Sequence, residues 1–201
     1  MSALESLKDH LIMVLDEEEK ARDESFSMSR DLIRSCRKLT SELVQENKVD
    51  ISELRDQAAR LLKFTEKGGQ RPSFTEDALA EYCEVEVLRS TLLDEDIPHP
   101  GSLGIPERAF VLGVCDSVGE MRRITLNRLL RTDLEGASRM YEKMKVIGHL
   151  IEGLVYPTGM IPLKRKQDVV RSLLDRTGGE LAVAKYSPNR LPQDLGGTED
   201  D

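Results

Sequence analysis

Residues 73–94 read SFTEDALAEYCEVEVLRSTLLD, and this stretch predicts one helix with an apolar face. Counted at about 100° per residue, five apolar residues fall within a single stripe about 80° wide. They are Phe74, Ala78, Val85, Leu88 and Leu92. Glu81 lies at the centre of the stripe and Glu84 at its edge. A carboxylate in such a place is costly unless it meets a cation or strong donors, so the helix predicts a site as well as a fold.

The rest of the chain also predicts helices. At four places a short polar residue is followed three positions later by Glu, a pattern that caps the first turn of a helix. These are Ser2-x-x-Glu5, Asp50-x-x-Glu53, Ser73-x-x-Glu76 and Thr132-x-x-Glu135. Apolar spacing and Gly/Pro breakers predict helices over residues 2–47, 50–67, 73–94, 106–131, 132–155 and 162–186. Alternating Val/Ile-rich runs and Asn-Gly hairpins, which are typical of strands, do not occur.

The first helix is unusually long. At about 1.5 Å per residue it would extend more than about 60 Å, farther than a small domain can cover. We expect it to break or to pack against another subunit. The prediction is therefore a single all-α domain of about six to seven helices over residues 1–186, in an oligomer, followed by a disordered acidic tail over residues 187–201.

The composition excludes several classes of protein. The chain has 201 residues, of which 39% are hydrophobic and 33% charged, and its net charge is −8. No apolar run approaches the ~20 residues of a membrane span, so no membrane partner is expected. The N-terminus lacks the basic start and apolar stretch of a signal peptide. Three scattered cysteines, Cys36, Cys83 and Cys115, predict buried free thiols in a reducing cytoplasm.

Positive charge gathers in three helical segments of this acidic chain. Residues 30–38, 120–145 and 164–185 each contain more bases than acids. One interpretation is a set of solvated helix faces, since basic residues are common near helix ends. The other is a groove or cavity that holds a polyanion.

Asp116 and Glu120 form a second pair of acids, one turn apart on the helix predicted over residues 106–131. If this helix and the one over residues 73–94 pack with their acidic faces together, the four carboxylates converge. Two bare charges about 4 Å apart repel by roughly 4 kcal/mol at an effective dielectric constant near 20. Such a cluster needs shared protons or a divalent cation, and oxygen ligands without a nearby histidine favour Mg²⁺ or Mn²⁺.

Chance offers a plainer interpretation of the same spacing. With 37 acids in 201 residues, Glu-x-x-Glu is expected several times without any function. On a solvated surface a like-charge pair costs only about 0.2–0.5 kcal/mol. The position of Glu81 in an apolar stripe adds weight to the metal site, and both interpretations stay open on spacing alone.

Four blocks of sequence, in their order and spacing, resemble the translin superfamily. They are Glu81-Tyr82-Cys83-Glu84, Gly113-Val114-Cys115-Asp116-Ser117-Val118-Gly119-Glu120-Met121-Arg122-Arg123, Tyr156-Pro157 and Lys164-Arg165-Lys166-Gln167-Asp168-Val169-Val170-Arg171. The resemblance runs from about Ser2 to Lys185 and is strongest to the archaeal members. It implies about seven helices that assemble as an octameric shell enclosing RNA or single-stranded DNA. The cysteines inside the two acidic blocks depart from the family pattern.

The resemblance also implies an activity. Translin-associated factor X carries a Glu-x-x-Glu and an Asp-x-x-x-Glu that support Mg²⁺-dependent endoribonuclease activity. Glu81 and Glu84 match the first pair, and Asp116 and Glu120 the second, so all four are expected to be catalytic residues and metal ligands. The basic residues expected to contact nucleic acid are Arg122, Arg123, Lys164, Arg165, Lys166 and Arg171.

Three functions are therefore compared. The first is a cytoplasmic homo-oligomer, an octamer, that cleaves single-stranded RNA with Mg²⁺ or Mn²⁺. The second is a shell of the translin type that binds single-stranded RNA or DNA without chemistry. The third is an all-α nucleoside triphosphate pyrophosphatase, which also uses Glu-x-x-Glu pairs. Its second motif is Glu-x-x-Asp, whereas this chain has Asp116-x-x-x-Glu120.

Overall fold

Helices α3 (Ser73–Leu92) and α5 (Glu107–Leu130) form the centre of the fold, because each packs against neighbours on more than one side. The computed structural model describes residues 3–67 and 72–186, and in these ranges it contains seven helices and no strand. Gly113 on α5 allows the close approach of the two helices. A Cβ at this position would overlap the carbonyl oxygen of Ala80 and lie 2.6 Å from the Cβ of Cys83.

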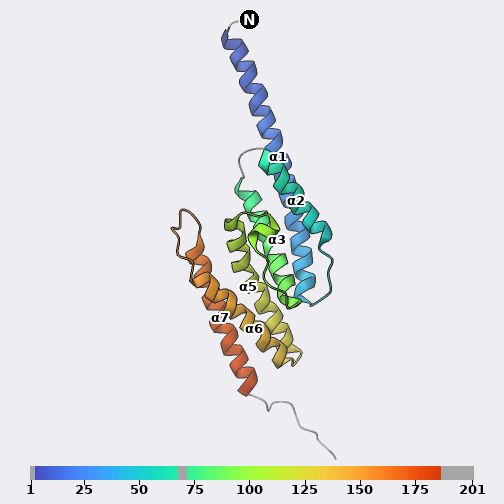
Figure 1. Ribbon diagram of the computed structural model, residues 1–201, viewed down its shortest axis with the longest axis vertical. Helices are drawn as coiled ribbons and strands as arrows, with labels where there is room; N and C mark the ends of the chain where they lie inside the picture. The colour runs from blue at the N-terminus through green and yellow to red at the C-terminus, as the bar shows by residue number, and fades with distance from the viewer. Residues whose placement is uncertain (1–2, 68–71, 187–201) are drawn as a thin grey trace, which may run out of the picture.

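Helix α1 (Ala3–Val44) is continuous and has two unlike halves (Figure 1). Its second half packs along α3 and buries Leu32, Cys36 and Leu43. Its first half extends beyond the other helices, so that Leu4 is 77% exposed and Leu15 60% exposed. The helix therefore does not break, and the predicted packing of its first half against another subunit stays a prediction.

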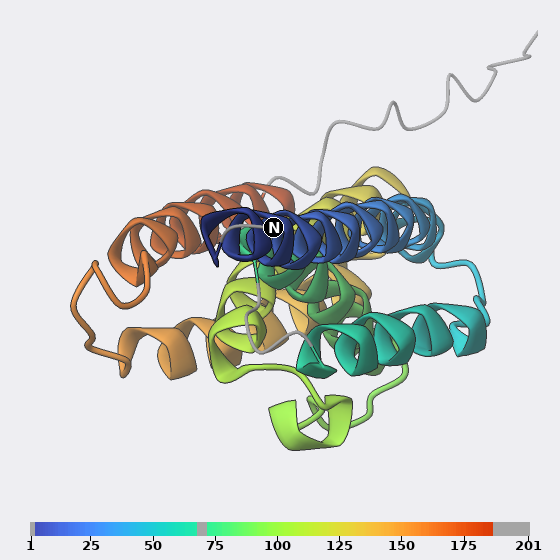
Figure 2. The ribbon, with the colours of Figure 1, turned by 90° about the horizontal axis from the view of Figure 1, so that it is seen from above.

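Helices α2 and α4 lie outside the centre. Helix α2 (Ser52–Lys67) packs along α1 and α3 and buries Leu54, Ala58 and Leu61. The short helix α4 (Pro100–Leu103) stands apart from the bundle when the molecule is viewed from above (Figure 2). It begins at His99, whose Nδ1 accepts a hydrogen bond from the backbone N–H of Gly101, and it ends at Gly104 with a positive φ of 67°. The sequence predicted only breakers here, since a four-residue helix has too few positions to show periodicity.

Helices α6 (Leu134–Glu152) and α7 (Leu163–Tyr186) cover the other side of α5. Together with α1 and α2 they surround α3 and α5, as the view from above shows (Figure 2). The side-chain amide of Gln167 donates hydrogen bonds of 2.8 Å to the carbonyl oxygens of Ile151 and Leu154. The start of α7 is thereby fixed against the end of α6.

The all-α prediction is confirmed, and most predicted helix ends lie within a few residues of those observed. Two predicted caps are wrong. Pro72 precedes α3 and no side chain caps the helix, so Ser73 has no capping role. Asp133, rather than Thr132, accepts a hydrogen bond from the N–H of Gly136 at the start of α6. The predicted cap at Ser2 and the predicted tail over residues 187–201 lie outside the described residues.

Two further predictions concern burial and membranes. All three cysteines are buried and free, as expected. Burial raises the pKa of the Cys36 thiol far above its ordinary value, so it packs as a small apolar group. Among the described helices, none combines the length and the apolar character that crossing a membrane would require.

Candidate functional site

The four predicted carboxylates come from the two central helices. Glu81 and Glu84 lie on α3, and Asp116 and Glu120 lie on α5, which packs directly against it. All four side chains are half-buried. Within each pair the two acids lie one helical turn apart. The relative orientation of α3 and α5 therefore decides whether the two pairs lie close together.

The two pairs lie near enough for their charges to interact, as the pKa values of Glu81 and Glu84 reflect. Burial raises the pKa of Glu84 to about 8, with further contributions from the negative charges of Glu81, Glu120 and Asp116. The pKa of Glu81 is also raised by burial, and again Asp116 and Glu120 add to the effect. The four acids thus lie within one another's electrostatic field, on the face of α3 that also adjoins α1. Carboxylates placed together in this way favour a shared proton or a cation.

Basic side chains already meet part of this negative charge. The ammonium of Lys166 on α7 contacts Oδ1 of Asp116. Arg123, one turn along α5, donates a hydrogen bond of 2.6 Å to Oε2 of Glu120. Arg37 on α1 lowers the pKa of Glu81 through its charge. Two residues predicted to bind nucleic acid, Arg123 and Lys166, are therefore partners of the acidic cluster within the chain.

The donor set fits a hard divalent cation in its chemistry but not in its present arrangement. Mg²⁺ or Mn²⁺ bound by the four carboxylates would offset their mutual repulsion, which contributes to the raised pKa of Glu84. Yet in the ranges 3–67 and 72–186 no three acidic, histidine or cysteine side chains stand close enough together to hold an ion. To bind, the cation would have to replace Lys166 as the partner of Asp116 and Arg123 as the partner of Glu120.

The other predicted nucleic-acid residues fall into two groups. Arg122 is only 16% exposed; it donates two hydrogen bonds of 2.7 Å to Glu180 and one of 2.8 Å to Thr177. Its guanidinium therefore joins α5 to α7. Arg171 is exposed and pairs with Glu152 and Asp168. These two side chains are already engaged within the chain.

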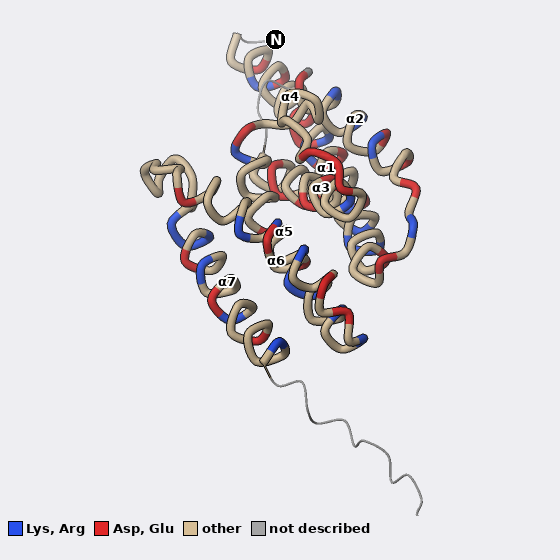
Figure 3. Tube along the Cα trace, turned by 60° about the horizontal axis from the view of Figure 1, so that its bottom comes forward, with Lys and Arg blue, Asp and Glu red and all other residues tan. Residues whose placement is uncertain are grey.

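Lys164 and Arg165 are exposed at the start of α7 and make no ion pair with any residue in the described part of the chain. Acidic and basic residues are interspersed along α7 (Figure 3). Lys164 and Arg165 are thus predicted nucleic-acid contacts that remain unpaired among the described residues, at the start of α7 and near the carboxylate cluster.

Comparison with known proteins bears on the fold. No family model matches the chain. It is 26% identical over 181 residues to an uncharacterized protein of Methanocaldococcus jannaschii, covering 87% of this chain and 81% of that protein. The structure of apo-NeC3PO has a TM-score of 0.78 at 19% identity, covering 92% of this chain and 98% of that one. The chain has the translin-type fold of C3PO.

Two structures of AfC3PO agree with this assignment. One is a complex with duplex RNA, with a TM-score of 0.73, and the other has a TM-score of 0.72; both are 24% identical to this chain. Each comparison covers 94% of this chain and all of the other. The resemblance to the translin superfamily, predicted from four short blocks, therefore extends to the C3PO fold over nearly the whole chain.

Sequence reasoning missed one charged residue at the centre of the C3PO fold. Glu86 on α3 is almost fully buried and binds Arg55 of α2 and the hydroxyl of Tyr82. It lies between Val85 and Val87 on a helix that is buried nearly all round. The signal that could have found it is Tyr82, because a phenol four residues earlier lies next to it on the helix surface.

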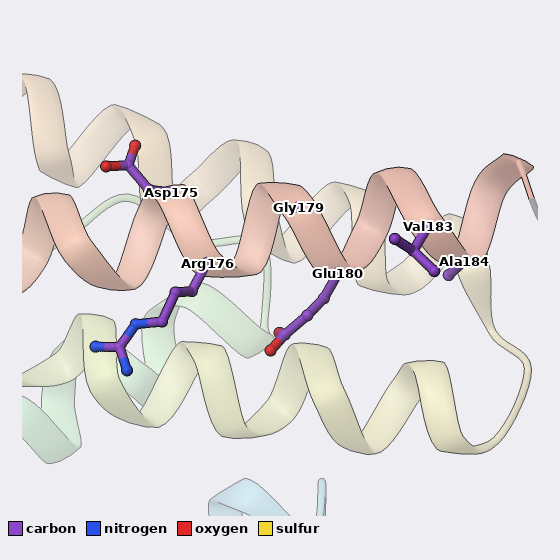
Figure 4. Close-up of a pocket in the computed structure, with 6 residues that line it drawn as sticks. All are labelled: Asp175, Arg176, Gly179, Glu180, Val183 and Ala184. Carbon is purple, nitrogen blue, oxygen red and sulfur yellow. The ribbon is translucent and has the colours of Figure 1, made fainter.

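A hollow of about 480 Å³ lies along the last turns of α7, away from the carboxylates (Figure 4). Arg176 and Glu180 point from α7 toward α5, whereas Asp175 lies on the opposite side of the helix. None of the four predicted carboxylates lines this hollow. It is therefore separate from the candidate site of this chain.

Proposed function

We propose that this chain is an RNA-binding protein of the translin type that cleaves single-stranded RNA with the help of Mg²⁺ or Mn²⁺. The observation that carries the proposal is the mutual electrostatic field of four carboxylates from two facing helices. The C3PO fold supports the RNA-binding part of the proposal, because one solved structure with this fold is a complex with duplex RNA. The proposed metal ligands are Glu81, Glu84, Asp116 and Glu120.

The residues of the cluster would have different roles in cleavage. A bound divalent cation supplies charge stabilisation at a phosphoryl oxygen and an acidified water. Glu84, whose pKa burial and the neighbouring acids raise to about 8, would have to lose its proton to bind the cation. Asp116 and Glu120, whose side chains are 42% and 21% exposed, would hold the cation from α5.

RNA would reach the cluster along α5 and the start of α7. Gly119 lies on the same face of α5 as Asp116 and Glu120, and a Cβ built there meets no atom within 4 Å. The surface beside these acids is therefore open. Lys164 and Arg165, exposed and unpaired among the described residues, would bind backbone phosphates without reading sequence.

A second candidate is a shell that binds RNA or single-stranded DNA without cleaving it. The ion pairs of Lys166 with Asp116 and of Arg123 with Glu120 favour it, because they neutralise the cluster without any metal. The two candidates share the RNA-binding surface and differ only in chemistry.

Cleavage of a labelled single-stranded RNA by the purified chain separates them. We expect cleavage in Mg²⁺ or Mn²⁺, none with a chelator, and none by Asp116→Asn, which still binds RNA. Asp175→Asn on the far side of α7 is the matched control and should cleave like the unmodified chain. Binding without divalent-dependent cleavage would establish the non-catalytic shell instead.

Assembly is part of the same proposal. The first half of α1 exposes Leu4, Leu7, Leu11 and Leu15, three or four residues apart on one side of a helix. This spacing suits packing of helix against helix, and we propose a homo-oligomer, an octamer, that encloses the RNA. Sedimentation at micromolar concentration should give a mass well above the 22.6 kDa of one chain, and a stable monomer would contradict the proposal.

A further inference from the structure

In the described part of the chain, Lys166 is the residue of α7 that forms an ion pair with the carboxylate cluster. Its ammonium contacts Oδ1 of Asp116, fifty residues earlier in the sequence. The exposed fractions of the two side chains are 33% and 42%, so the pair lies at the rim of the cluster, where solvent can enter.

The fold holds Lys166 in this place through its neighbours on α7. Leu163 and Val170 are both 2% exposed and anchor the first two turns in the core. Gln167 binds the carbonyl oxygens at the end of α6. These three contacts fix the backbone of α7 on both sides of Lys166. The position of the helix therefore places Lys166 next to Asp116.

The charge of Lys166 reaches more than one acid. Its charge lowers the pKa of both Glu81 and Glu84 on α3. The other charges at the cluster are Glu120 and Arg123 on α5 and Arg37 on α1. Lys166 is therefore a shared counter-ion for carboxylates of both central helices.

We propose that Lys166 is a positioning residue that competes with a divalent cation for Asp116 and so sets the affinity of the cluster for metal. The inference rests on the proposed function, because the same carboxylates are the proposed ligands. The ammonium contacts Oδ1 of Asp116, so a cation that takes this oxygen displaces it and breaks a link between α5 and α7. Lysine suits this role because its single compact charge leaves without a second hydrogen bond to break.

The competing explanation gives Lys166 a purely structural role. An ion pair between partly exposed groups adds little stability, and it would fasten α7 to α5 whether or not metal is present. The two explanations differ when the charge is removed. A structural pair predicts the same loss of thermal stability with and without metal. A competitor predicts a loss without metal and tighter metal binding.

The test is Mn²⁺ binding to the purified full-length chain, measured by isothermal titration calorimetry for Lys166→Met and the unmodified protein. Methionine keeps the length and apolar stem of lysine and removes the charge. Asp116→Asn defines the part of the signal that belongs to the cluster. Lys145→Met is the matched control, because Lys145 also forms an ion pair, with Glu142 on α6, but does not contact the cluster.

We expect Lys166→Met to bind Mn²⁺ about three- to tenfold more tightly than the unmodified chain. This is the size of effect expected when the metal no longer has to displace one partly solvated ion pair and is no longer repelled by the ammonium. Lys145→Met should bind with unchanged affinity. In chelator, Lys166→Met should melt at a lower temperature than the unmodified chain, and saturating Mn²⁺ should remove that difference.

Two results would overturn the inference. If Lys166→Met binds Mn²⁺ no more tightly than Lys145→Met does, Lys166 is not a competitor, although the metal site stands. If neither chain shows Mn²⁺ binding that Asp116→Asn abolishes, the proposed metal site itself fails and the inference fails with it. Circular dichroism confirms that each variant is folded, and Lys166→Gln replaces Lys166→Met if the latter is not.

Discussion

Arg55 on α2 holds the buried carboxylate of Glu86 on α3 through two parallel hydrogen bonds, from Nε to Oε1 at 2.7 Å and from Nη2 to Oε2 at 2.8 Å. The hydroxyl of Tyr82 donates a third, of 2.9 Å, to Oε1. The Glu86 side chain is 2% exposed and that of Arg55 is 51% exposed. A surface cation thus reaches inward to an acid in the core, two residues from Glu84, and ties α2 to α3.

Arg55→Met should therefore destabilise the fold. Removing the guanidinium leaves a buried charge with only the Tyr82 hydroxyl as partner. Breaking a fully buried pair costs about 3–5 kcal/mol, and because Arg55 is half-exposed we expect about 1–3 kcal/mol in the free energy of unfolding. Urea denaturation measures the loss. Arg60→Met, an exposed residue of the same helix, should stay within about 0.5 kcal/mol of the unmodified chain.

The raised pKa of Glu84 predicts how stability changes with pH. Because the pKa of Glu84 is about 8 in the folded chain and its ordinary value is 4.5, the folded chain holds an extra proton between these values. Stability should therefore fall as pH rises from about 4.5 to about 8, by at most about 1.4 kcal/mol per pH unit. Glu84→Gln should flatten this slope and stabilise the chain most at alkaline pH. Equal slopes in urea denaturation of the two chains would contradict the assignment.

Gly119→Ala separates stability from function. Alanine is favoured over glycine in a helix by about 1 kcal/mol, and the added methyl group meets nothing within 4 Å. We expect a slightly more stable chain that binds and cleaves RNA less well, because the methyl group stands where the RNA would approach Asp116. Gly179→Ala on α7 is the control, since its surroundings are equally open, and it should change stability alone. Unchanged RNA cleavage by Gly119→Ala would show that RNA approaches elsewhere.

The basic residues should divide according to their partners. The double variant Lys164→Ala/Arg165→Ala should bind single-stranded RNA more weakly and with a shallower dependence on salt, because fewer phosphate contacts release counterions. Arg122→Met should instead lower the free energy of unfolding, because it removes three hydrogen bonds between α5 and α7. Filter binding at several salt concentrations, paired with urea denaturation, tests both. A double variant that binds like the unmodified chain would leave the start of α7 as a solvated surface.

Local pattern was enough to predict the helices and the pairing of acids on each. The apolar stripe of residues 73–94 placed Glu81 and Glu84 toward the neighbouring helices, and the structure finds both half-buried there. The small errors lie at helix ends. Thr132 has a φ of 61° and cannot begin a helix, a constraint that no spacing rule expresses.

Partners distant in sequence were beyond such reasoning. Glu180 lies fifty-eight residues after Arg122, and nothing near either residue marks the other. Lys166 and Asp116 are similarly remote, so a base predicted to bind RNA turned out to contact a predicted metal ligand. Glu86 was missed for a different reason, because most of α3 is buried and the helix has no clear polar face against which a buried acid stands out.

The two halves of α1 have a consequence for hydrogen exchange. Residues from Ser25 onward are held by the core, while most residues of the half before them are exposed in a single chain. A lone helix of that length is marginal in water, so its amides should exchange quickly at high dilution. Any partner that covers the exposed leucines would slow this exchange. Protection of the first half of α1 against exchange should then increase with protein concentration, whereas protection of the second half should depend only on the folding of the chain.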